Sequence, residues 1–322
     1  MGGLQAGGGM LMSIAFLFPG QGSPTPGMFD GLPAHPVTDA TLNEASSILG
    51  RDVRRFVEEA ALVSEESVQI ALLVVGVAAA RVLLAEGVKP DLVGGMSVGA
   101  FAAAVAASAL NFGEALSLVQ LRARLMIEAY PTGYGLSVIT GLDERRVSRL
   151  VESVRTPEFP VYLANFNAPS QLVIAGSDAA MAEVLRRAAT EGARKAQRLA
   201  VNVPSHCPLY ERVSAEMRKA MVAVPMRRPL IPCLGNCHGR ALFDTEPLRE
   251  DLAASLCHPV RWHEATTVAF ERGVRLFIET PPDSTLTDLA EAAFPEARAV
   301  AMAHQPLETI VRLAKGQELP PS

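Results

Sequence analysis

The chain has 322 residues, and 49% of them are hydrophobic. This length allows one large domain, or one domain into which a smaller domain is inserted, and the hydrophobic content allows a sizeable core. The formal net charge is −5 at pH 7, so the charge balance does not favour nucleic acid or an anionic membrane as a partner.

The four cysteines are few and scattered, which favours a reducing, cytoplasmic setting over a secreted disulfide framework. Cys233 and the pair Cys237-His238 resemble half of a metal site, but no second pair of ligands follows at a suitable spacing. We therefore expect no metal, and we expect buried free thiols at Cys207, Cys233, Cys237 and Cys257.

Two stretches bear on targeting and membranes. Residues 1–12 are rich in glycine and lack Lys and Arg, unlike the start of a signal peptide, so we expect a disordered extension. Residues 92–110 carry no charge and are long enough to span a membrane. They contain several glycines and serines, however, and a buried strand, a turn and a helix explain them better, so we expect no membrane partner.

The first predicted strand is the apolar run at residues 13–18. It is followed by Pro19-Gly20-Gln21-Gly22-Ser23, a loop that could aim the amide of Gln21 into a site or could be an ordinary turn. Helices are predicted at 38–49 and, after the N-cap residue Ser64, over a longer stretch. Because residues 70–84 are apolar on almost all sides, this second helix should be buried.

The pattern Gly95-Met96-Ser97-Val98-Gly99 lies between a predicted strand at 91–94 and a predicted helix at 100–110. This is the setting of a nucleophile elbow, in which glycines permit a sharp turn and a close approach of neighbouring elements. The serine would lie at a helix N-terminus, where free N–H groups stabilise an anion. The pattern alone is short, and a glycine-rich turn without catalytic function is the alternative.

The stretch at residues 133–203 differs in character from what precedes it. A helix at 112–129, capped by Asn111 and carrying Arg122, comes directly before it. Within the stretch, the order strand, helix, strand, strand, helix, strand predicts a ferredoxin-like subdomain inserted into the chain. The strands are predicted at 136–139, 161–166, 171–175 and 196–203, and the helices at 143–154 and 179–191.

After residue 204 the chain returns to alternating helices and strands. This alternation predicts a mostly parallel sheet with helices on both faces, built from residues 13–132 and 204–322. The strands are predicted at 231–234, 275–278 and 298–302, and the helices at 247–256, 264–271, 286–293 and from the residue after Pro208 to Met221.

Six motifs that follow one another along the chain resemble the malonyl-CoA:acyl-carrier-protein transacylases, the acyltransferases of fatty-acid and polyketide synthesis. The resemblance covers essentially the whole chain after Met12. The motifs are Phe18-Pro19-Gly20-Gln21-Gly22-Ser23, Gly95-x-Ser97-x-Gly99, Leu121-Arg122-Ala123-Arg124-Leu125-Met126, Asn165-Phe166-Asn167, Val203-Pro204-Ser205-His206 and Pro259-Val260-Arg261-Trp262.

The resemblance implies an α/β-hydrolase-like parallel-sheet core with an inserted ferredoxin-like subdomain. It implies that Ser97 is acylated, that His206 is its base, and that a backbone carbonyl at Ser255 orients the histidine. A serine hydroxyl is a poor nucleophile until a neighbouring base takes its proton, so the two residue types suit this chemistry.

The resemblance also implies an oxyanion hole made by the backbone N–H of Val98 and by Gln21, and a malonate-binding role for Arg122. A guanidinium holds a carboxylate through two parallel hydrogen bonds, which lysine cannot imitate. Malonyl-CoA would be the donor substrate, and an acyl carrier protein with a phosphopantetheine-type arm would be the acceptor in a ping-pong reaction. The enzyme would be an [acyl-carrier-protein] S-malonyltransferase that needs no cofactor of its own.

The sequence departs from the common family pattern at two places. Met96 and Ala100 replace the usual His and Glu beside the serine, and Glu279-Thr280-Pro281-Pro282-Asp283 replaces the usual Glu-x-Gly-Pro-Gly. With Phe101, the first departure resembles the epsilon subunit of malonate decarboxylase, whose carrier has an arm related to dephospho-CoA. A malonyltransferase of fatty-acid or polyketide synthesis is the alternative.

Two further alternatives come from different classes. A serine esterase would need an acid between the serine and the histidine, and Asp143 and Asp178 lie in that interval. A catalytically silent subunit that only docks a carrier would have no need for the motif residues. Because such carriers are acidic, a basic docking surface is expected. The candidates are Arg186, Arg187, Arg194, Lys195 and Arg198, and an ordinary solvated helix face is the alternative for these residues.

Overall fold

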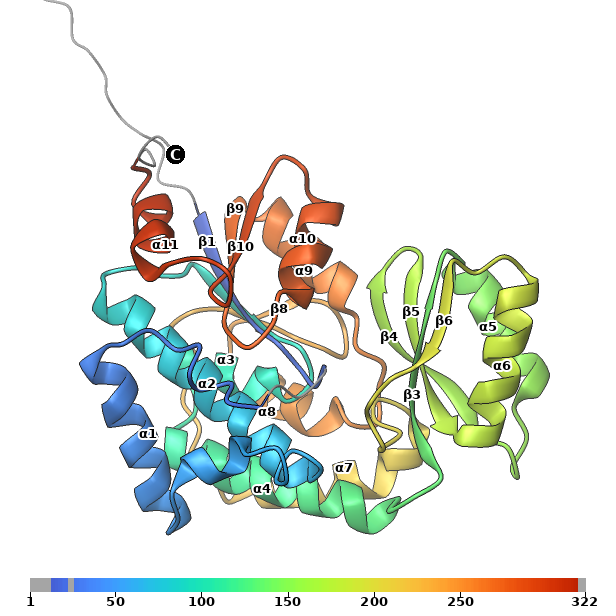
Figure 1. The fold of residues 1–322 in the computed structure, drawn as a ribbon. Helices are drawn as coiled ribbons and strands as arrows, with labels where there is room; N and C mark the ends of the chain where they lie inside the picture. The colour runs from blue at the N-terminus through green and yellow to red at the C-terminus, as the bar shows by residue number, and fades with distance from the viewer. Residues whose placement is uncertain (1–12, 23–25, 318–322) are drawn as a thin grey trace, which may run out of the picture.

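The computed structural model describes residues 13–22 and 26–317, so the predicted extension at residues 1–12 lies outside the described residues. Two sheets form the molecule (Figure 1). The larger has six strands in the order β10-β9-β1-β2-β7-β8, all parallel except β8 at one edge. Its strands are β1 (Ser13–Phe18), β2 (Leu92–Gly95), β7 (Cys233–Leu234), β8 (Ala241–Leu242), β9 (Val274–Glu279) and β10 (Arg298–Ala301).

Both faces of this sheet are covered by helices, as β1 shows. Phe16 and Phe18 point into one apolar cluster, with α2 and α3, whereas Ala15 and Leu17 point into a second, with α9 and α10. The predicted α/β class with a mostly parallel sheet is therefore confirmed. The helices of this core are α1 (Pro36–Leu49), α2 (Glu65–Ala85), α3 (Gly99–Ala106), α4 (Phe112–Ala129), α7 (Glu211–Val222), α8 (Thr245–Ala254), α9 (Trp262–Glu271), α10 (Thr285–Ala293) and α11 (Leu307–Ala314), with short 3-10 helices η1 (Val53–Val57) and η2 (Pro208–Tyr210).

Helix α2 is the central helix of the core. By length and apolarity it is the one helix in the described part of the chain that could cross a membrane, but 83% of its most apolar window is buried inside the protein. Its burial agrees with the nearly continuous apolar sequence that it presents. The uncharged stretch at residues 92–110 is divided between β2 and α3, as the sequence predicts.

The smaller sheet belongs to a separate unit at the right of Figure 1. Its strand order, β4-β5-β3-β6, and its antiparallel pairing are those of a ferredoxin-like fold, and it has its own apolar core. A backbone bond from Phe166 N to Val260 O (2.8 Å) links it to the larger unit. Its elements are β3 (Tyr134–Thr140), α5 (Glu144–Val154), β4 (Val161–Ala168), β5 (Gln171–Ser177), α6 (Asp178–Thr190) and β6 (Lys195–Arg198).

Several predicted boundaries are wrong. The strand predicted at 196–203 ends at Arg198, whose guanidinium binds the carbonyls of Leu199 and Val201 and turns the chain out of the sheet. The helix predicted at 100–110 ends at Ala106, because Ser108 adopts a left-handed conformation (φ 57°). The sequence analysis missed α11, and it missed β8, whose two residues are too short to produce a periodic pattern.

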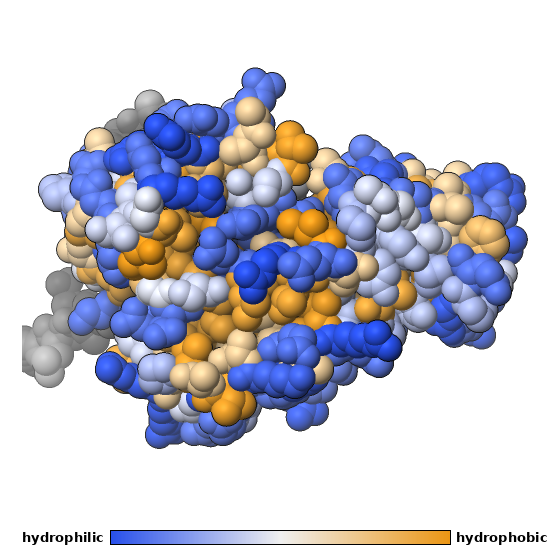
Figure 2. Space-filling model, turned by 90° about the horizontal axis from the view of Figure 1, so that it is seen from below, coloured by the Kyte–Doolittle hydropathy of each residue, from blue (hydrophilic) through white to orange (hydrophobic). Residues whose placement is uncertain are grey.

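Figure 2 shows one face of the surface. Apolar side chains interrupt this face mainly over the larger unit, whereas the smaller unit presents a mostly hydrophilic surface there. The smaller unit therefore resembles an ordinary solvated domain on this side, and its apolar residues are used in its own core.

Candidate active site

Ser97 lies in the turn between β2 and α3, in a left-handed conformation with φ 54°. This conformation is rare for a residue with a side chain and is held only by its surroundings. The flanking glycines are required by space, because a Cβ on Gly95 would lie 2.1 Å from the backbone of Gly99 and one on Gly99 would lie 2.3 Å from Phe18 O. The turn therefore has the geometry of the predicted elbow.

His206 is brought to this turn from the loop that precedes η2. Its Nε2 lies 2.8 Å from Ser97 Oγ, and its Nδ1 lies 2.5 Å from the carbonyl oxygen of Ser255, at the C-terminus of α8. A backbone bond from His206 N to Leu256 O (2.7 Å) holds the loop against the same segment. The two ring nitrogens of His206 thus connect the hydroxyl of Ser97 to the carbonyl of Ser255.

The contacts of His206 settle which ring nitrogen carries the proton. A carbonyl oxygen only accepts, so Nδ1 donates to Ser255 and Nε2 is left to accept the hydroxyl proton of Ser97. Burial and, to a smaller degree, the positive charge of Arg122 lower the pKa of His206 to about 3, against the opposing effect of the Ser255 bond. The imidazole is therefore neutral at pH 7 and arranged as a base toward the serine.

Arg122 reaches the same point from α4 and is fully buried. Its Nη2 donates to Ser97 Oγ at 3.0 Å, and its Nη1 donates to the side-chain oxygen of Gln69. Burial lowers its pKa to about 10, so it keeps its charge at pH 7. Within residues 13–22 and 26–317 no carboxylate forms an ion pair with Arg122, and its Nε has no hydrogen-bond partner. The site is therefore a buried cation beside the hydroxyl of Ser97, with capacity for an anion.

Gln21 is held at the edge of the site by two residues of α2. Its Nε2 donates to Glu65 Oε2 at 2.5 Å, and its Oε1 accepts from Gln69 Nε2 at 3.5 Å. A primary amide has two N–H groups, so one remains after the bond to Glu65. The predicted oxyanion role of Gln21 therefore depends on this second N–H.

The backbone N–H of Val98 lies at the N-terminus of α3, directly after the serine, and the residue is buried. It donates to no acceptor in the described part of the chain, whereas the next two N–H groups donate to Met96 O and Ser97 O. A free N–H at a helix start is suited to an anion. This arrangement is compatible with the predicted role of Val98.

The acids considered for an esterase lie elsewhere. Asp143 caps the start of α5, and Asp178 pairs with Arg198 at 3.2 Å, both on the surface of the smaller unit. The position that such an acid would take, at His206 Nδ1, is occupied by the carbonyl of Ser255. The structure therefore does not bring together the third member that an esterase of this type needs.

The sequence analysis did not single out three residues that the structure places at the site. Gln69 orients both Arg122 and Gln21, Glu65 holds Gln21, and Asn236 accepts from the backbone N–H of Ser97 at 2.9 Å. Gln69 is an isolated polar residue at the edge of an otherwise apolar helical stretch, which could have marked it. The other two carried no local signal.

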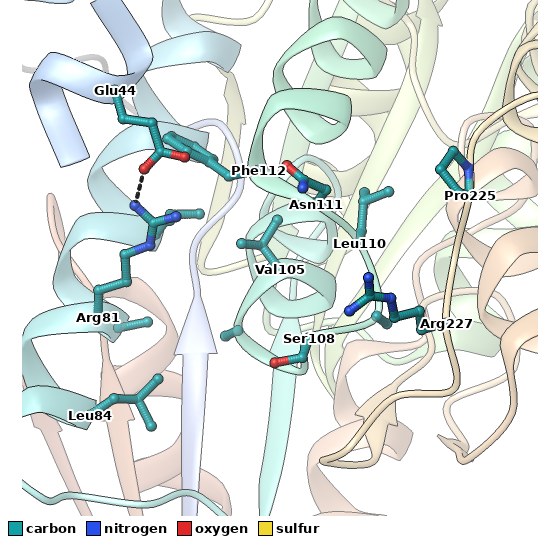
Figure 3. Close-up of a pocket in the computed structure, with 14 residues that line it drawn as sticks. Glu44, Arg81, Leu84, Val105, Ser108, Leu110, Asn111, Phe112, Pro225 and Arg227 are labelled. Carbon is teal, nitrogen blue, oxygen red and sulfur yellow. Dashed lines mark hydrogen bonds and ion pairs between the residues drawn. The ribbon is translucent and has the colours of Figure 1, made fainter. Parts of the chain in front are cut away.

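A pocket of about 460 Å³ lies at the far end of α3 from Ser97 (Figure 3). Arg81 and Glu44 form an ion pair of 2.6 Å at its wall, and Val105, Ser108 and Arg227 also line it. None of the predicted site residues lines this pocket. The described residues also contain no group of three or more His, Cys, Asp or Glu that could hold a metal ion.

Comparison with known proteins agrees with this geometry. The model of the acyl transferase domain family matches residues 15–317. The malonyl CoA-acyl carrier protein transacylase of Salmonella typhimurium is 33% identical over 289 residues, which cover 87% of this chain and 93% of the relative.

Solved structures show the same similarity. The malonyl CoA-acyl carrier protein transacylase of Coxiella burnetii superposes with a TM-score of 0.89 at 34% identity, covering 95% of this chain and 98% of that one. A malonyl-transacylase solved in complex with a type II polyketide acyl carrier protein superposes with a TM-score of 0.88 at 33% identity, covering 95% of this chain and 100% of that one. The chain therefore belongs to the acyl transferase domain family, and it is an acyltransferase.

Proposed function

We propose that this acyltransferase moves a malonyl group from malonyl-CoA to the thiol of an acyl carrier protein, through a malonyl ester on Ser97. The observation that carries the proposal is the position of Ser97 Oγ, 2.8 Å from His206 Nε2 and 3.0 Å from the buried guanidinium of Arg122. The free carboxylate of a malonyl ester is separated from the ester carbonyl by one CH₂ group. A cation that touches the serine oxygen is therefore within reach of that carboxylate.

In the first half-reaction Ser97 Oγ attacks the thioester carbonyl while His206 Nε2 takes the hydroxyl proton. The tetrahedral oxyanion accepts hydrogen bonds from Val98 N–H and from the second N–H of Gln21. The C–S bond then breaks, and the leaving thiolate of CoA takes the proton from His206. The products are CoA and malonyl-Ser97.

The second half-reaction reverses these roles. The thiol of the carrier's prosthetic arm gives its proton to His206 and attacks the ester carbonyl, and Ser97 Oγ leaves with that proton. The carboxylate stays on Arg122 in both halves, so the same contact selects the donor and retains the intermediate. The reacting thiol belongs to the carrier, so the chain itself supplies only the residues described above.

We further propose the carrier of malonate decarboxylase as the acceptor. Met96 and Pro282–Asp283, which depart from the common family pattern, line one small cavity together with Gln21. These residues therefore change the lining of the cavity beside the proposed oxyanion hole, while Ser97 and His206 themselves are retained. Relatives named for malonyl-CoA and a polyketide carrier support the alternative acceptor, a carrier of fatty-acid or polyketide synthesis.

The candidate basic surface for such a carrier is reduced by internal pairing. Arg186 and Arg187 both bind Glu183, at 2.8 and 2.7 Å, and Arg198 binds Asp178. The remaining candidates are Arg194 and Lys195, at the edge of the smaller unit. Arg186 and Arg187 share the single carboxylate of Glu183, so one positive charge remains there. Steering of an acidic carrier would depend on this charge together with Arg194 and Lys195.

The test measures each half-reaction separately. Intact mass after mixing with malonyl-CoA should show one malonyl adduct, absent from Ser97→Ala, and an adduct that persists in this variant would overturn the assignment. The acylated protein is then offered holo-carriers of both kinds at one salt concentration. A higher kcat/KM with the fatty-acid carrier would reject the decarboxylase acceptor and keep the malonyltransferase assignment.

A further inference from the structure

Asn236 is a buried residue that none of the proposed reaction steps uses. Its Oδ1 accepts from Ser97 N at 2.9 Å, and its Nδ2 donates to Gly95 O at 2.8 Å. Its backbone N–H donates to Asp251 Oδ2 at 2.8 Å, and its backbone oxygen accepts from Arg261 N at 2.8 Å. Every one of its polar groups thus has a partner, in a residue only 2% exposed.

The side chain of Asn236 extends the sheet beyond its last backbone pair. The parallel pairing of β2 with β7 ends at Gly94 opposite Leu234. Beyond that point the carboxamide of Asn236, which presents one acceptor and one donor like a peptide group, binds both Gly95 and Ser97. The chain leaving β2 is therefore bound, as far as the proposed nucleophile, to the segment that follows β7.

This contact holds Ser97 in a conformation that it would not keep by itself. A φ of 54° is unfavourable for a residue with a side chain and persists only where the surrounding structure holds it. Within the described part of the chain, the backbone N–H of Ser97 donates to Asn236 Oδ1 and to no other acceptor. The direction of the Ser97 side chain toward His206 thus depends on a hydrogen bond from another element.

Asp251 joins this contact to the other half of the site. Its carboxylate accepts from Asn236 N and from Cys237 N (2.9 Å), and its backbone oxygen accepts from Ser255 N at 2.9 Å. Ser255 O in turn accepts from His206 Nδ1. The last turn of α8 therefore positions the histidine directly and the serine through Asn236.

We propose that Asn236 is a positioning residue for acyl transfer. It holds the Ser97 backbone at a fixed position relative to α8, the helix that orients His206. The proposal rests on the proposed role of Ser97 as nucleophile. A displacement of about 1 Å at a reacting atom can lower a rate roughly a hundredfold. Loss of the Asn236 contacts should therefore lower the rate of Ser97 acylation and leave the affinity for malonyl-CoA nearly unchanged.

The experiment compares three variants. Asn236→Ala removes both side-chain bonds. Asn236→Asp keeps an oxygen that accepts from Ser97 N. When the Asp is ionised, however, its other oxygen faces Gly95 O, so two acceptors repel each other where the Asn side chain donates. Ser214→Ala is the matched control, because it removes a buried bond of 2.8 Å to Ala253 O on the same helix α8 without touching Asn236. Each variant is checked for folding by circular dichroism and thermal unfolding before the rates are measured.

We expect single-turnover acylation of Asn236→Ala to be slower by about a hundredfold, with KM for malonyl-CoA within about threefold of the parent value. Acylation of Asn236→Asp should recover as the pH falls, because a protonated Asp donates to Gly95 O as Asn does. Ser214→Ala should acylate at the parent rate. Asn236→Ala with an unchanged rate, or Asn236→Asp with no recovery at low pH, would overturn the proposal.

A serine-directed fluorophosphonate separates this proposal from the proposed function, because it reports the reactivity of Ser97 without a malonyl group. Slow labelling of Asn236→Ala beside fast labelling of the parent and of Ser214→Ala would support the role of Asn236 even if malonyl-CoA failed as a donor. Equal labelling of all three proteins would reject it. If Asn236→Ala does not fold, Asn236→Asp decides by the same measurement.

Discussion

The guanidinium of Arg122 donates to the hydroxyl oxygen of Ser97 at 3.0 Å from a fully buried position on α4. Burying a charge costs free energy unless hydrogen bonds or an opposite charge offset that cost. In the described residues, the guanidinium of Arg122 is hydrogen-bonded to the neutral side chains of Gln69 and Ser97. A substrate carboxylate would supply the missing countercharge. In the proposed reaction, Arg122 would therefore select the substrate carboxylate directly beside Ser97, the residue that is acylated.

Arg122→Ala should lower malonyl transfer strongly and change acetyl transfer much less. The loss of a buried charge-assisted contact is on the order of 3 kcal/mol, or roughly a hundredfold in kcat/KM. The measurement is the ratio of kcat/KM for malonyl-CoA and acetyl-CoA. Arg124→Ala is the control, because Arg124 lies on the same helix but is exposed and only weakly paired with Glu128 at 3.9 Å. An unchanged ratio in Arg122→Ala would make Arg122 structural.

The rate of Ser97 acylation should persist well below the ordinary histidine pKa of 6.5. Burial and the charge of Arg122 lower the pKa of His206 to about 3, so the free enzyme keeps a neutral base in mild acid. The measurement is kcat/KM for malonyl-CoA from pH 4 to pH 8. An acid limb centred near pH 6.5 would contradict the burial of His206 in the working enzyme.

The same pKa makes the stability dependent on pH. Between pH 6.5 and pH 3 the unfolded chain protonates His206 and the folded chain does not, so the free energy of unfolding falls as the pH falls. At pH 4.5 the loss from this group is roughly 3 kcal/mol relative to pH 7. Urea unfolding at both pH values should therefore show a smaller loss for His206→Gln than for the parent protein. Equal losses of unfolding free energy in the parent and in His206→Gln would show that His206 is not responsible for the pH dependence.

Gly99→Ala should destabilise the protein and abolish acylation. The new Cβ would lie 2.3 Å from Phe18 O, at the end of β1, and 2.6 Å from Pro19 O, in the loop that carries Gln21. Gly113→Ala is the matched control, because Gly113 is helical and its new Cβ would meet nothing closer than 3.6 Å. Because Gly113 lies in the first turn of α4, where the helix-interior penalty of glycine does not fully apply, this control should keep the parent stability to within about 0.5 kcal/mol. Full activity in Gly99→Ala would mean that the elbow tolerates a wider turn.

Glu65 should matter through its hydrogen bond to Gln21 rather than through its charge. Glu65→Gln keeps an oxygen that can accept from Gln21 Nε2, so its acylation rate should stay near that of the parent protein. Glu65→Ala frees the amide of Gln21 and should slow acylation toward the level of Gln21→Ala, roughly a hundredfold below the parent rate. If Glu65→Ala acylates normally, Gln21 does not need this contact.

Much of the molecule was predictable because it depends on local patterns. The apolar run at Ser13–Phe18, the apolar helix α2 and the alternation after residue 204 predicted the parallel sheet and its class, which the structure confirms. The six motifs predicted the family, which the comparisons confirm. Boundaries were less predictable, since Arg198 and Ser108 end their elements through contacts and backbone conformations that no periodicity reveals.

The contacts that orient the site were decided by the tertiary structure. Asn236 lies 139 residues from Ser97 and Gln69 lies 53 residues from Arg122, so no spacing in the chain relates them. Asn236 meets Ser97 because the parallel pairing of β2 with β7 brings the carboxyl ends of these strands together. Gln69 meets Arg122 because helix α2 packs against helix α4. The sequence itself shows the residue types that the proposed reaction needs. The orientation of Ser97 and His206 comes instead from burial and from hydrogen bonds between distant elements, and these exist only once the chain has folded.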